Sequence, residues 1–154
     1  AGVTSAHKVT MELANPLSHL RGVIDFRYFS DKILPHLNGD IEHVGEVKEE
    51  AKLQFISRAK ALLFPIQWDE PFGMVAIESM ACGTPVIGWN RAALPEIIED
   101  GVCGFLVNSV EEIVEKTGEL NKLRRSDCRK RVEDNFSVEK MASEYVKLYE
   151  SLIK

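Results

Sequence analysis

Short apolar runs alternate along the middle of the chain with segments in which apolar residues recur every three or four positions. The runs predict strands, and the periodic segments predict helices. The predicted strands are Ile41–Val44, Leu62–Phe64, Pro85–Gly88 and Gly104–Val107, and the predicted helices are Glu46–Lys60, Gly73–Cys82 and Leu94–Glu99. This alternation is typical of an α/β fold in which helices cover both faces of a parallel sheet.

The two ends of the chain have different patterns. From Val110 onward the period is helical, which predicts a helical C-terminal tail with Ser126 and Ser137 as helix caps. The last helix carries one apolar stripe, formed by Met141, Tyr145, Leu148 and Leu152. Near the N-terminus, Phe26–Leu37 is compatible with a helix, although Ser30, Asp31 and Pro35 obscure its boundaries.

Composition restricts the class of protein. A chain of 154 residues with 45% hydrophobic residues is about the size of one globular domain. Its formal net charge of −5 argues against a general nucleic-acid-binding surface. The sequence has no apolar run near the ~18 residues of a membrane span and no signal-peptide pattern at its start. We therefore expect a cytoplasmic protein without a transmembrane segment.

The cysteines and histidines give no sign of a metal centre or a catalytic base. Cys82, Cys103 and Cys128 are odd in number and lack C-x-x-C spacing, so we expect free thiols, with Cys82 packed as a small hydrophobe. The four histidines have no partner pattern that would make one of them a general base; they are His7, His19, His36 and His43.

The segment from Glu70 to Glu78 is the strongest candidate for a binding site. It places two carboxylates eight positions apart across a predicted loop-to-helix junction. A helix N-terminus attracts anions through its free N–H groups, and carboxylates accept hydrogen bonds from hydroxyl groups. The pattern therefore indicates a ligand that is both phosphorylated and rich in hydroxyl groups.

This region resembles a known family. The run from Ala61 to Val107 is similar to the donor-binding core of retaining nucleotide-sugar glycosyltransferases of family 4 (group 1), which have the two-Rossmann-domain GT-B architecture. The similarity rests on the E-x7-E motif, the A-C-G-T-P-V-I segment and the P-E-I-I-E-D-G sequence, and it extends more weakly over Ile41–Val47. The resemblance implies a single Rossmann-like domain over residues 1–154, namely the C-terminal donor-binding domain of such an enzyme.

The resemblance also implies roles for individual residues. Glu78 would hold the ribose hydroxyls of the nucleotide, unless it is an exposed glutamate that only complements the helix dipole. Glu70 would contact a hydroxyl of the donor sugar at the catalytic centre, unless it is a solvated turn carboxylate beside Asp69. Phe72, Gly73 and Met74 would act through their backbone amides, although Gly73 is also compatible with a purely conformational role.

Other positions leave two interpretations open. Arg91 is compatible with a phosphate contact in the donor site or with a solvated surface position. It is followed by Ala92 and Ala93, where the family commonly has glycines, and alanine disfavours the positive φ that a close backbone approach would need. Trp68 is compatible with stacking on a base or sugar ring or with a packing role. The segment Gly83–Pro85 is typical of a helix C-cap.

Two elements of the resembled enzymes are missing from this sequence. Their G-R…K-G sequence, which supplies a basic pair to the diphosphate, does not occur here, and neither does their N-terminal acceptor domain. We therefore expect hexose transfer from a nucleotide diphosphate sugar, without a metal or other cofactor, to an unknown acceptor and only with an N-terminal partner domain. Peripheral membrane association of the full-length enzyme remains open. The alternative is a non-catalytic nucleotide- or partner-binding module of the same fold.

Overall fold

The computed structural model describes residues 9–11, 27–44, 47 and 49–153. The chain divides into two compact units, residues 1–52 and residues 53–154, and each is described separately. Some expectations fall outside the described residues. These are His7, His19 and the positions 45–46 and 48 near the start of the helix predicted from Glu46.

In the first unit, strand β1 (Val9–Met11) pairs in parallel with β2 (Ile41–His43). A π-helical turn over Phe29–Ile33 and a 3-10 turn over Leu34–His36 precede β2, where the sequence suggested one helix. The side-chain oxygen of Asn38 accepts hydrogen bonds from the N–H groups of Asp40, at 2.8 Å, and Ile41, at 3.1 Å. This turn directs the chain into β2.

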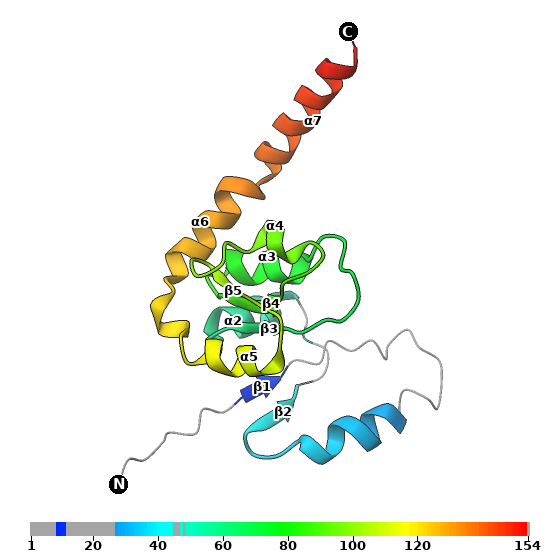
Figure 1. Ribbon diagram of the computed structural model, residues 1–154, viewed down its shortest axis with the longest axis vertical. Helices are drawn as coiled ribbons and strands as arrows, with labels where there is room; N and C mark the ends of the chain where they lie inside the picture. Colours follow the sequence, from blue (N-terminus) through cyan, green and yellow to red (C-terminus); the bar gives the residue numbers. More distant parts are fainter. Residues whose placement is uncertain (1–8, 12–26, 45–46, 48, 154) are drawn as a thin grey trace. The chain divides into compact units, whose positions relative to one another are not determined.

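The second unit contains a three-stranded parallel sheet (Figure 1). Its strands are β3 (Leu62–Phe64), β4 (Val86–Trp89) and β5 (Gly104–Val107), in that order across the sheet. Leu62 lies opposite Val86, and Val86 lies opposite Gly104. The predicted strands and the parallel pairing are confirmed. Leu63 is 40% exposed, so β3 is less buried than its apolar sequence suggests.

Helices cover both faces of this sheet, as predicted (Figure 1). Helices α3 (Met74–Ala81) and α4 (Leu94–Ile97) lie on one face, and α5 (Val110–Thr117) lies on the other. Successive strand residues point to opposite faces. Val86 accordingly packs in the cluster with Ala76, Met80 and Leu94, whereas Ile87 packs with Phe105 and Val107. All seven of these side chains are 5% exposed or less.

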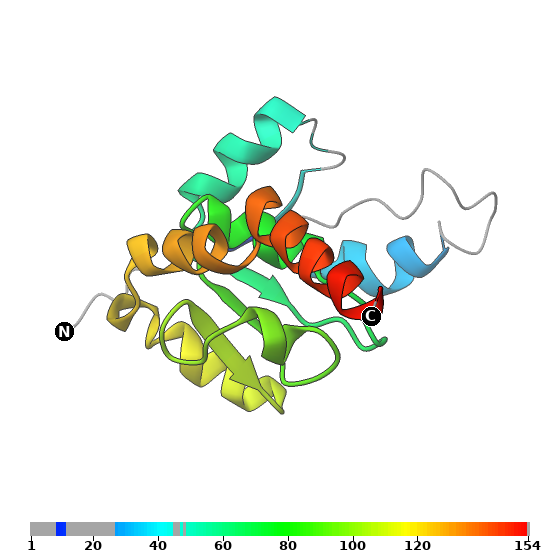
Figure 2. The same ribbon diagram turned by 90° about the horizontal axis from the view of Figure 1, so that it is seen from above.

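Helix α6 (Arg125–Asn135) packs against α3 (Figure 2) and joins its neighbours through its first residue. The guanidinium group of Arg125 donates to the carbonyls of Ser57 and Ala59, at the end of α2 (Glu49–Arg58). It also donates to the Thr84 hydroxyl at 2.7 Å, and that hydroxyl donates to the Ile56 carbonyl at 2.8 Å. One arginine thus satisfies backbone carbonyls that the end of α2 would otherwise leave without donors.

The turn that ends α3 has the predicted C-cap structure. Gly83 has φ +75°, and its N–H donates to the Met80 carbonyl at 2.8 Å. The N–H of Thr84 donates to the Ser79 carbonyl at 2.9 Å. These two bonds form a Schellman motif, in which a left-handed residue ends the helix. Glycine is favoured here because it adopts positive φ without a steric cost.

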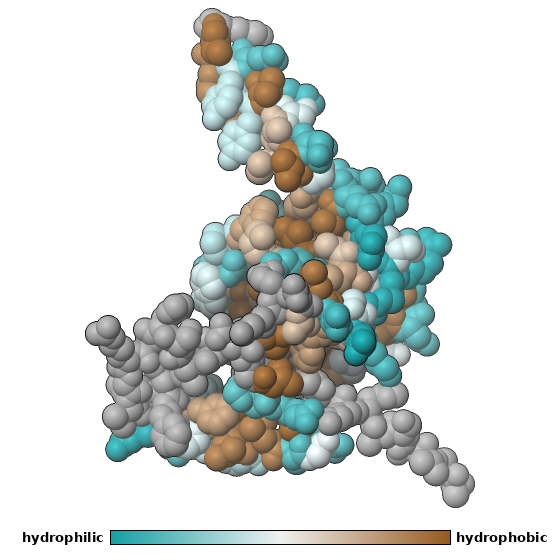
Figure 3. Space-filling model, turned by 180° about the vertical axis from the view of Figure 1, so that it is seen from behind, coloured by the Kyte–Doolittle hydropathy of each residue, from teal (hydrophilic) through white to brown (hydrophobic). Residues whose placement is uncertain are grey.

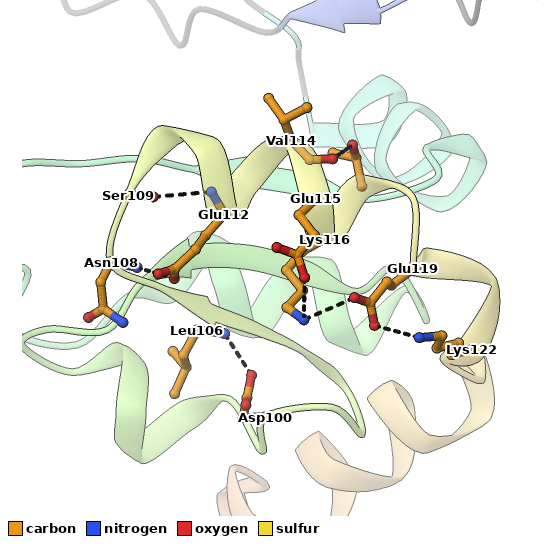
Figure 4. Close-up of polar contacts among 11 residues, drawn as sticks. Asp100, Leu106, Asn108, Ser109, Glu112, Val114, Glu115, Lys116, Glu119 and Lys122 are labelled. Carbon is orange, nitrogen blue, oxygen red and sulfur yellow. Dashed lines mark hydrogen bonds and ion pairs between the residues drawn. The ribbon is translucent and has the colours of Figure 1, made fainter.

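The caps of the C-terminal helices are only partly as predicted. Ser137 caps α7 (Val138–Leu152) by accepting a hydrogen bond from Lys140 N–H at 3.2 Å, which confirms that prediction. Ser126 lies inside α6, so its prediction as a cap is wrong. Ser109, which was not predicted, caps α5 by accepting from Glu112 N–H at 3.1 Å (Figure 4). The Glu112 carboxylate accepts in return from Asn108 N–H at 2.8 Å.

The tail helix α7 extends away from the sheet beyond α6 (Figure 1) and is exposed along its length. Its predicted apolar stripe is exposed, with Met141, Tyr145, Leu148 and Leu152 each more than half accessible. Figure 3 shows apolar side chains on the surface of this helix. Within the described part of the chain, no helix is both long enough and apolar enough to span a membrane.

The cysteines differ from expectation in their burial. All three are free thiols, as predicted. Cys103 and Cys128 are fully buried, whereas Cys82, which was expected to pack as a small hydrophobe, is only half-buried. The Cys128 thiol donates to the Cys103 carbonyl at 3.4 Å. Burial raises the pKa of Cys103, and it raises the pKa of Cys128 from 9.0 to about 11.

Candidate functional site

Most of the sequence-predicted site residues lie on two loops that follow neighbouring parallel strands. Residues 65–73 connect β3 to α3, and residues 90–93 connect β4 to α4. Because β3 and β4 are parallel neighbours, both loops leave the sheet at its carboxyl edge. Ligands of open α/β sheets bind at this edge. The two loops are therefore the place to examine the site in detail.

Glu70 is hydrogen-bonded to the start of α3. Its Oε1 atom accepts a hydrogen bond from the Gly73 N–H at 3.0 Å. Its carbonyl accepts from the Ala93 N–H, on the second loop, at 3.3 Å. Glu70 is therefore not the freely solvated turn carboxylate that the sequence left open. It is half-buried, and one of its carboxylate oxygens is used in capping α3.

Gly73 has a conformational reason to be glycine. It is the N-cap residue of α3 with φ +77°, and its carbonyl accepts from the N–H groups of Ala76 and Ile77. A Cβ atom built on Gly73 would lie 2.9 Å from Cδ1 of Ile97. The dihedral angle disfavours a side chain at this position, and a Cβ atom would also have to displace the end of the Ile97 side chain. Phe72 and Met74, on either side, are 52% and 55% exposed.

Glu78 lies on α3, in the second turn of the helix. The residues around it on the helix are buried, namely Ala76, Ile77, Ser79 and Met80, whereas Glu78 itself is half-buried. The E-x7-E motif therefore places one carboxylate on the loop and the other on the helix of a single β–loop–α unit. A half-buried carboxylate of this kind is accessible to hydroxyl groups of a ligand.

Arg91 binds the first loop rather than lying in solvent alone. Its Nε and Nη2 atoms both donate to Oδ1 of Asp69, with the Nε bond at 3.1 Å, and Nη1 donates to the Gln67 carbonyl at 2.8 Å. The guanidinium group thus links residues 67 and 69 to the loop that follows β4. A guanidinium group has five N–H donors, and these bonds use three of them, one on each nitrogen.

Ala92 corrects an expectation from the sequence. The replacement of glycine by alanine argued against a left-handed backbone in this loop, yet Ala92 has φ +52°. Among the described residues it is the only one other than glycine with positive φ. Three hydrogen bonds around it determine the backbone path: Arg91 N–H to Trp89 O, Ala93 N–H to Glu70 O and Leu94 N–H to Arg91 O. The loop therefore keeps a glycine-like conformation in spite of its alanine.

A cavity of about 250 Å³ lies beside the second loop. It is lined by Gln67, Trp89, Asn90, Arg91, Val107 and Asn108. The Trp89 indole N–H is buried and has no hydrogen-bond partner. Trp68, in contrast, is 60% exposed, so the packing role that the sequence left open for Trp68 is not what the structure shows.

Asp69 and Gln67 are the residues of this site that sequence reasoning missed. Asp69 is separated from Arg91 by 22 residues, and no local pattern announces their ion pair. The sheet topology could have indicated this pair. Asp69 follows β3 and Arg91 follows β4, which are neighbouring strands of the predicted parallel sheet, so the two loops meet at one edge.

Comparison with known proteins decides the family. The model of the family "Glycosyl transferases group 1" matches residues 29–135, which is more than half of the chain and includes both loops and both carboxylates of the motif. The chain belongs to this family. The expectation from the sequence is confirmed in this respect.

A curated relative and two solved structures agree with this assignment. The MMP α-(1→4)-mannosyltransferase of Mycolicibacterium hassiacum is 31% identical over 135 residues, which is 80% of this chain and 33% of the relative. The sucrose-phosphate synthase of Thermosynechococcus elongatus matches 95% of this chain and 38% of its own, with 26% identity and a TM-score of 0.74. The Anabaena HepE protein, solved with UDP-glucose, matches 86% of this chain and 38% of its own, with 21% identity and a TM-score of 0.67.

These matches establish the fold as well as the family. The α/β fold with a parallel sheet and a helical C-terminal tail is that of Rossmann-like glycosyltransferase domains, as predicted. The chain spans about a third of the length of the curated relative described above and somewhat more of the two solved chains. It is therefore a group 1 glycosyltransferase chain that corresponds to only part of its relatives.

Proposed function

We propose that this chain binds the nucleotide diphosphate sugar donor of a retaining hexosyltransferase. The observation that supports the proposal best is the E-x7-E unit, in which Glu70 lies in the loop after β3 and Glu78 lies on α3. Membership of the glycosyltransferase group 1 family gives this unit its chemical context. The relation to HepE, whose structure contains UDP-glucose, supports a nucleotide sugar as the ligand class.

In this proposal Glu70 and Glu78 bind different parts of the donor. Glu78 accepts hydrogen bonds from the two ribose hydroxyls, since a carboxylate offers two acceptor oxygens to a vicinal diol. Glu70 accepts from a hydroxyl of the hexose through the oxygen that does not cap α3. The backbone N–H groups of Phe72 and Met74 face the donor oxygens at the N-terminus of α3, where the helix dipole favours negative charge, whereas the Gly73 N–H donates to Glu70.

The proposed reaction moves the hexose from the diphosphate to an acceptor with retention of anomeric configuration. Charge develops on the diphosphate as its bond to the anomeric carbon breaks, and backbone amides aimed at these oxygens lower the barrier electrostatically. No metal is part of this proposal. The curated relative described above is about three times longer than the matched region. In this proposal, acceptor binding and full turnover therefore require a region outside this chain.

Titration calorimetry tests the proposal. The chain is titrated with UDP-glucose, GDP-mannose and ADP-glucose and with each parent nucleotide. We expect one nucleotide and its sugar derivative to bind, and Glu78→Gln to weaken both by 1–3 kcal/mol, which is about the value of one charge-assisted hydrogen bond. Glu111→Gln, a surface substitution on α5, is the matched control. Equal binding by the wild-type chain and Glu78→Gln would contradict the proposal.

A further inference from the structure

Trp68 is exposed although the backbone on both sides of it is fixed. Its side chain is 60% accessible. The residue before it, Gln67, accepts a hydrogen bond from Arg91 at its carbonyl, and the residue after it, Asp69, pairs with Arg91 through its carboxylate. The loop is therefore held in place without the indole taking part. An aromatic side chain that anchored the loop by packing would instead be buried.

The same short loop carries Glu70. Its carbonyl accepts a hydrogen bond from the Ala93 N–H, so positions 67, 69 and 70, on either side of Trp68, are all hydrogen-bonded to the loop after β4. This order places an exposed indole two residues from the carboxylate that the proposed function assigns to the sugar. The side chains of Phe72 and Met74, close by in sequence, are also more than half exposed.

The chemistry of an indole suits one part of the proposed ligand. One face of a pyranose ring presents C–H groups, while its hydroxyls point outward. Aromatic side chains supply a flat apolar surface at a small entropic cost because they have only two rotatable side-chain bonds. Ligand sites combine such apolar surfaces with a few polar groups that fix the orientation. In this loop Glu70 would supply the polar group and Trp68 the surface.

We infer that Trp68 is a sugar-stacking residue of this site and that Arg91 is the positioning residue that holds it in place through Asp69 and Gln67. The inference rests on the proposed function and adds to it a residue that contacts the pyranose ring. The ring belongs either to the donor hexose or to a separate sugar bound beside the nucleotide. The nucleotide itself does not contact Trp68 in this arrangement.

The test compares a nucleotide with its sugar derivative. The pair is chosen as the one that the wild-type chain binds among UDP-glucose, GDP-mannose and ADP-glucose. Calorimetry is expected to give about tenfold weaker binding of the nucleotide sugar for Trp68→Ala and a smaller loss for Trp68→Phe. Binding of the parent nucleotide is expected to stay within twofold. Tyr149→Ala on α7, which removes a similarly exposed aromatic side chain, is the control and should change neither affinity.

Substitution of Asp69, the ion-pair partner of Arg91, distinguishes a positioning role of Arg91 from a direct phosphate contact. If Arg91 acts by holding the loop, Asp69→Ala and Arg91→Ala weaken binding of the nucleotide sugar by the same factor. Both substitutions then leave the affinity for the parent nucleotide nearly unchanged. A phosphate contact would make Arg91→Ala weaken both ligands, while Asp69→Ala, which removes a competing anion, would weaken neither. That second result would overturn the positioning role.

Fluorescence identifies the contact directly. The chain has two tryptophans, so in Trp89→Phe the emission comes from Trp68 alone. We expect the nucleotide sugar to shift or quench this emission and the nucleotide alone to leave it unchanged. If only the nucleotide together with free glucose or mannose produces the change, the stacked ring belongs to a separate sugar.

Failure of this inference differs from failure of the proposed function. Glu78-dependent binding that is indifferent to Trp68→Ala and silent in fluorescence would overturn the stacking role and leave the function in place. Absence of binding to every nucleotide and nucleotide sugar would overturn both.

Discussion

The Gly73 N–H donates to Oε1 of Glu70 at 3.0 Å, so the carboxylate proposed to meet the donor sugar also caps helix α3. The two tasks use different oxygens of one group. A substitution of Glu70 therefore changes the stability of α3 and the affinity for the sugar together, unless it keeps the acceptor. This coupling leads to the first prediction.

Glu70→Gln is expected to keep the fold and Glu70→Ala to lose part of it. The glutamine side-chain oxygen still accepts from Gly73 N–H, whereas alanine leaves that donor without its cap at a cost of about 1 kcal/mol. Urea unfolding measures the difference. Both variants should bind the nucleotide sugar more weakly than the wild-type chain, so a Glu70→Gln variant that is as unstable as Glu70→Ala would contradict the capping role.

Exchanging alanine for glycine at two adjacent positions should have opposite effects on stability. Ala92 has φ +52°, so Ala92→Gly is expected to stabilise the chain by up to about 1 kcal/mol because it relieves left-handed backbone strain. Ala93 has φ −74°, so Ala93→Gly gains nothing in the folded state and is expected to destabilise by about 0.5–1 kcal/mol. Two losses of equal size in thermal unfolding would show that Ala92 is not strained.

Arg125 and Thr84 are expected to act as one unit. Arg125→Met removes the hydrogen bonds to Ser57, Ala59 and Thr84 and should cost about 2 kcal/mol of unfolding free energy. Thr84→Val removes one of the two donors to the Ile56 carbonyl, the other being Ala59 N–H, and leaves Arg125 without one acceptor, so it should cost about 1 kcal/mol. In the double variant the loss is expected to fall short of the sum by about 1 kcal/mol. Strict additivity would contradict a shared network.

Stability is expected to fall above pH 9 in a way that depends on Cys128. Burial raises the pKa of this thiol from 9.0 to about 11, so between these values the unfolded chain loses the proton while the folded chain keeps it. The unfolded state then binds fewer protons, and the free energy of unfolding decreases as pH rises. Unfolding curves at several pH values should show a shallower decrease for Cys128→Ala than for the half-buried control Cys82→Ala. Identical slopes would exclude Cys128 as the cause.

Local patterns predicted the elements of the second unit well. The apolar run at residues 104–107 became β5 with the same limits, and the Gly83 turn has the C-cap geometry that its sequence indicated. Both features depend on residues close together in the chain. Hydrophobic runs and glycine before proline report such local preferences directly.

The failures arose where distant residues decide the local structure. Ser126 was predicted to cap a helix, yet α6 begins one residue earlier, at Arg125, whose side chain reaches the carbonyls at the end of α2. Ala92 adopts positive φ against its preference because hydrogen bonds from Ala93 and Leu94 determine the loop. The Arg91–Asp69 pair joins two loops that only the sheet brings together. A single sequence gives no direct signal for any of these contacts.

The most direct test of the proposed function is whether the Glu78 carboxylate binds the ribose hydroxyls of the nucleotide. The nucleoside diphosphate that binds in calorimetry is compared with its 2′,3′-dideoxy analogue, on the wild-type chain and on Glu78→Gln. We predict that the wild-type chain binds the analogue at least about tenfold more weakly and that Glu78→Gln loses most of this discrimination, since the hydroxyls and the carboxylate contribute through the same hydrogen bonds. Equal discrimination by the two proteins would contradict the assignment of Glu78 to the ribose hydroxyls and, with it, the proposed donor site.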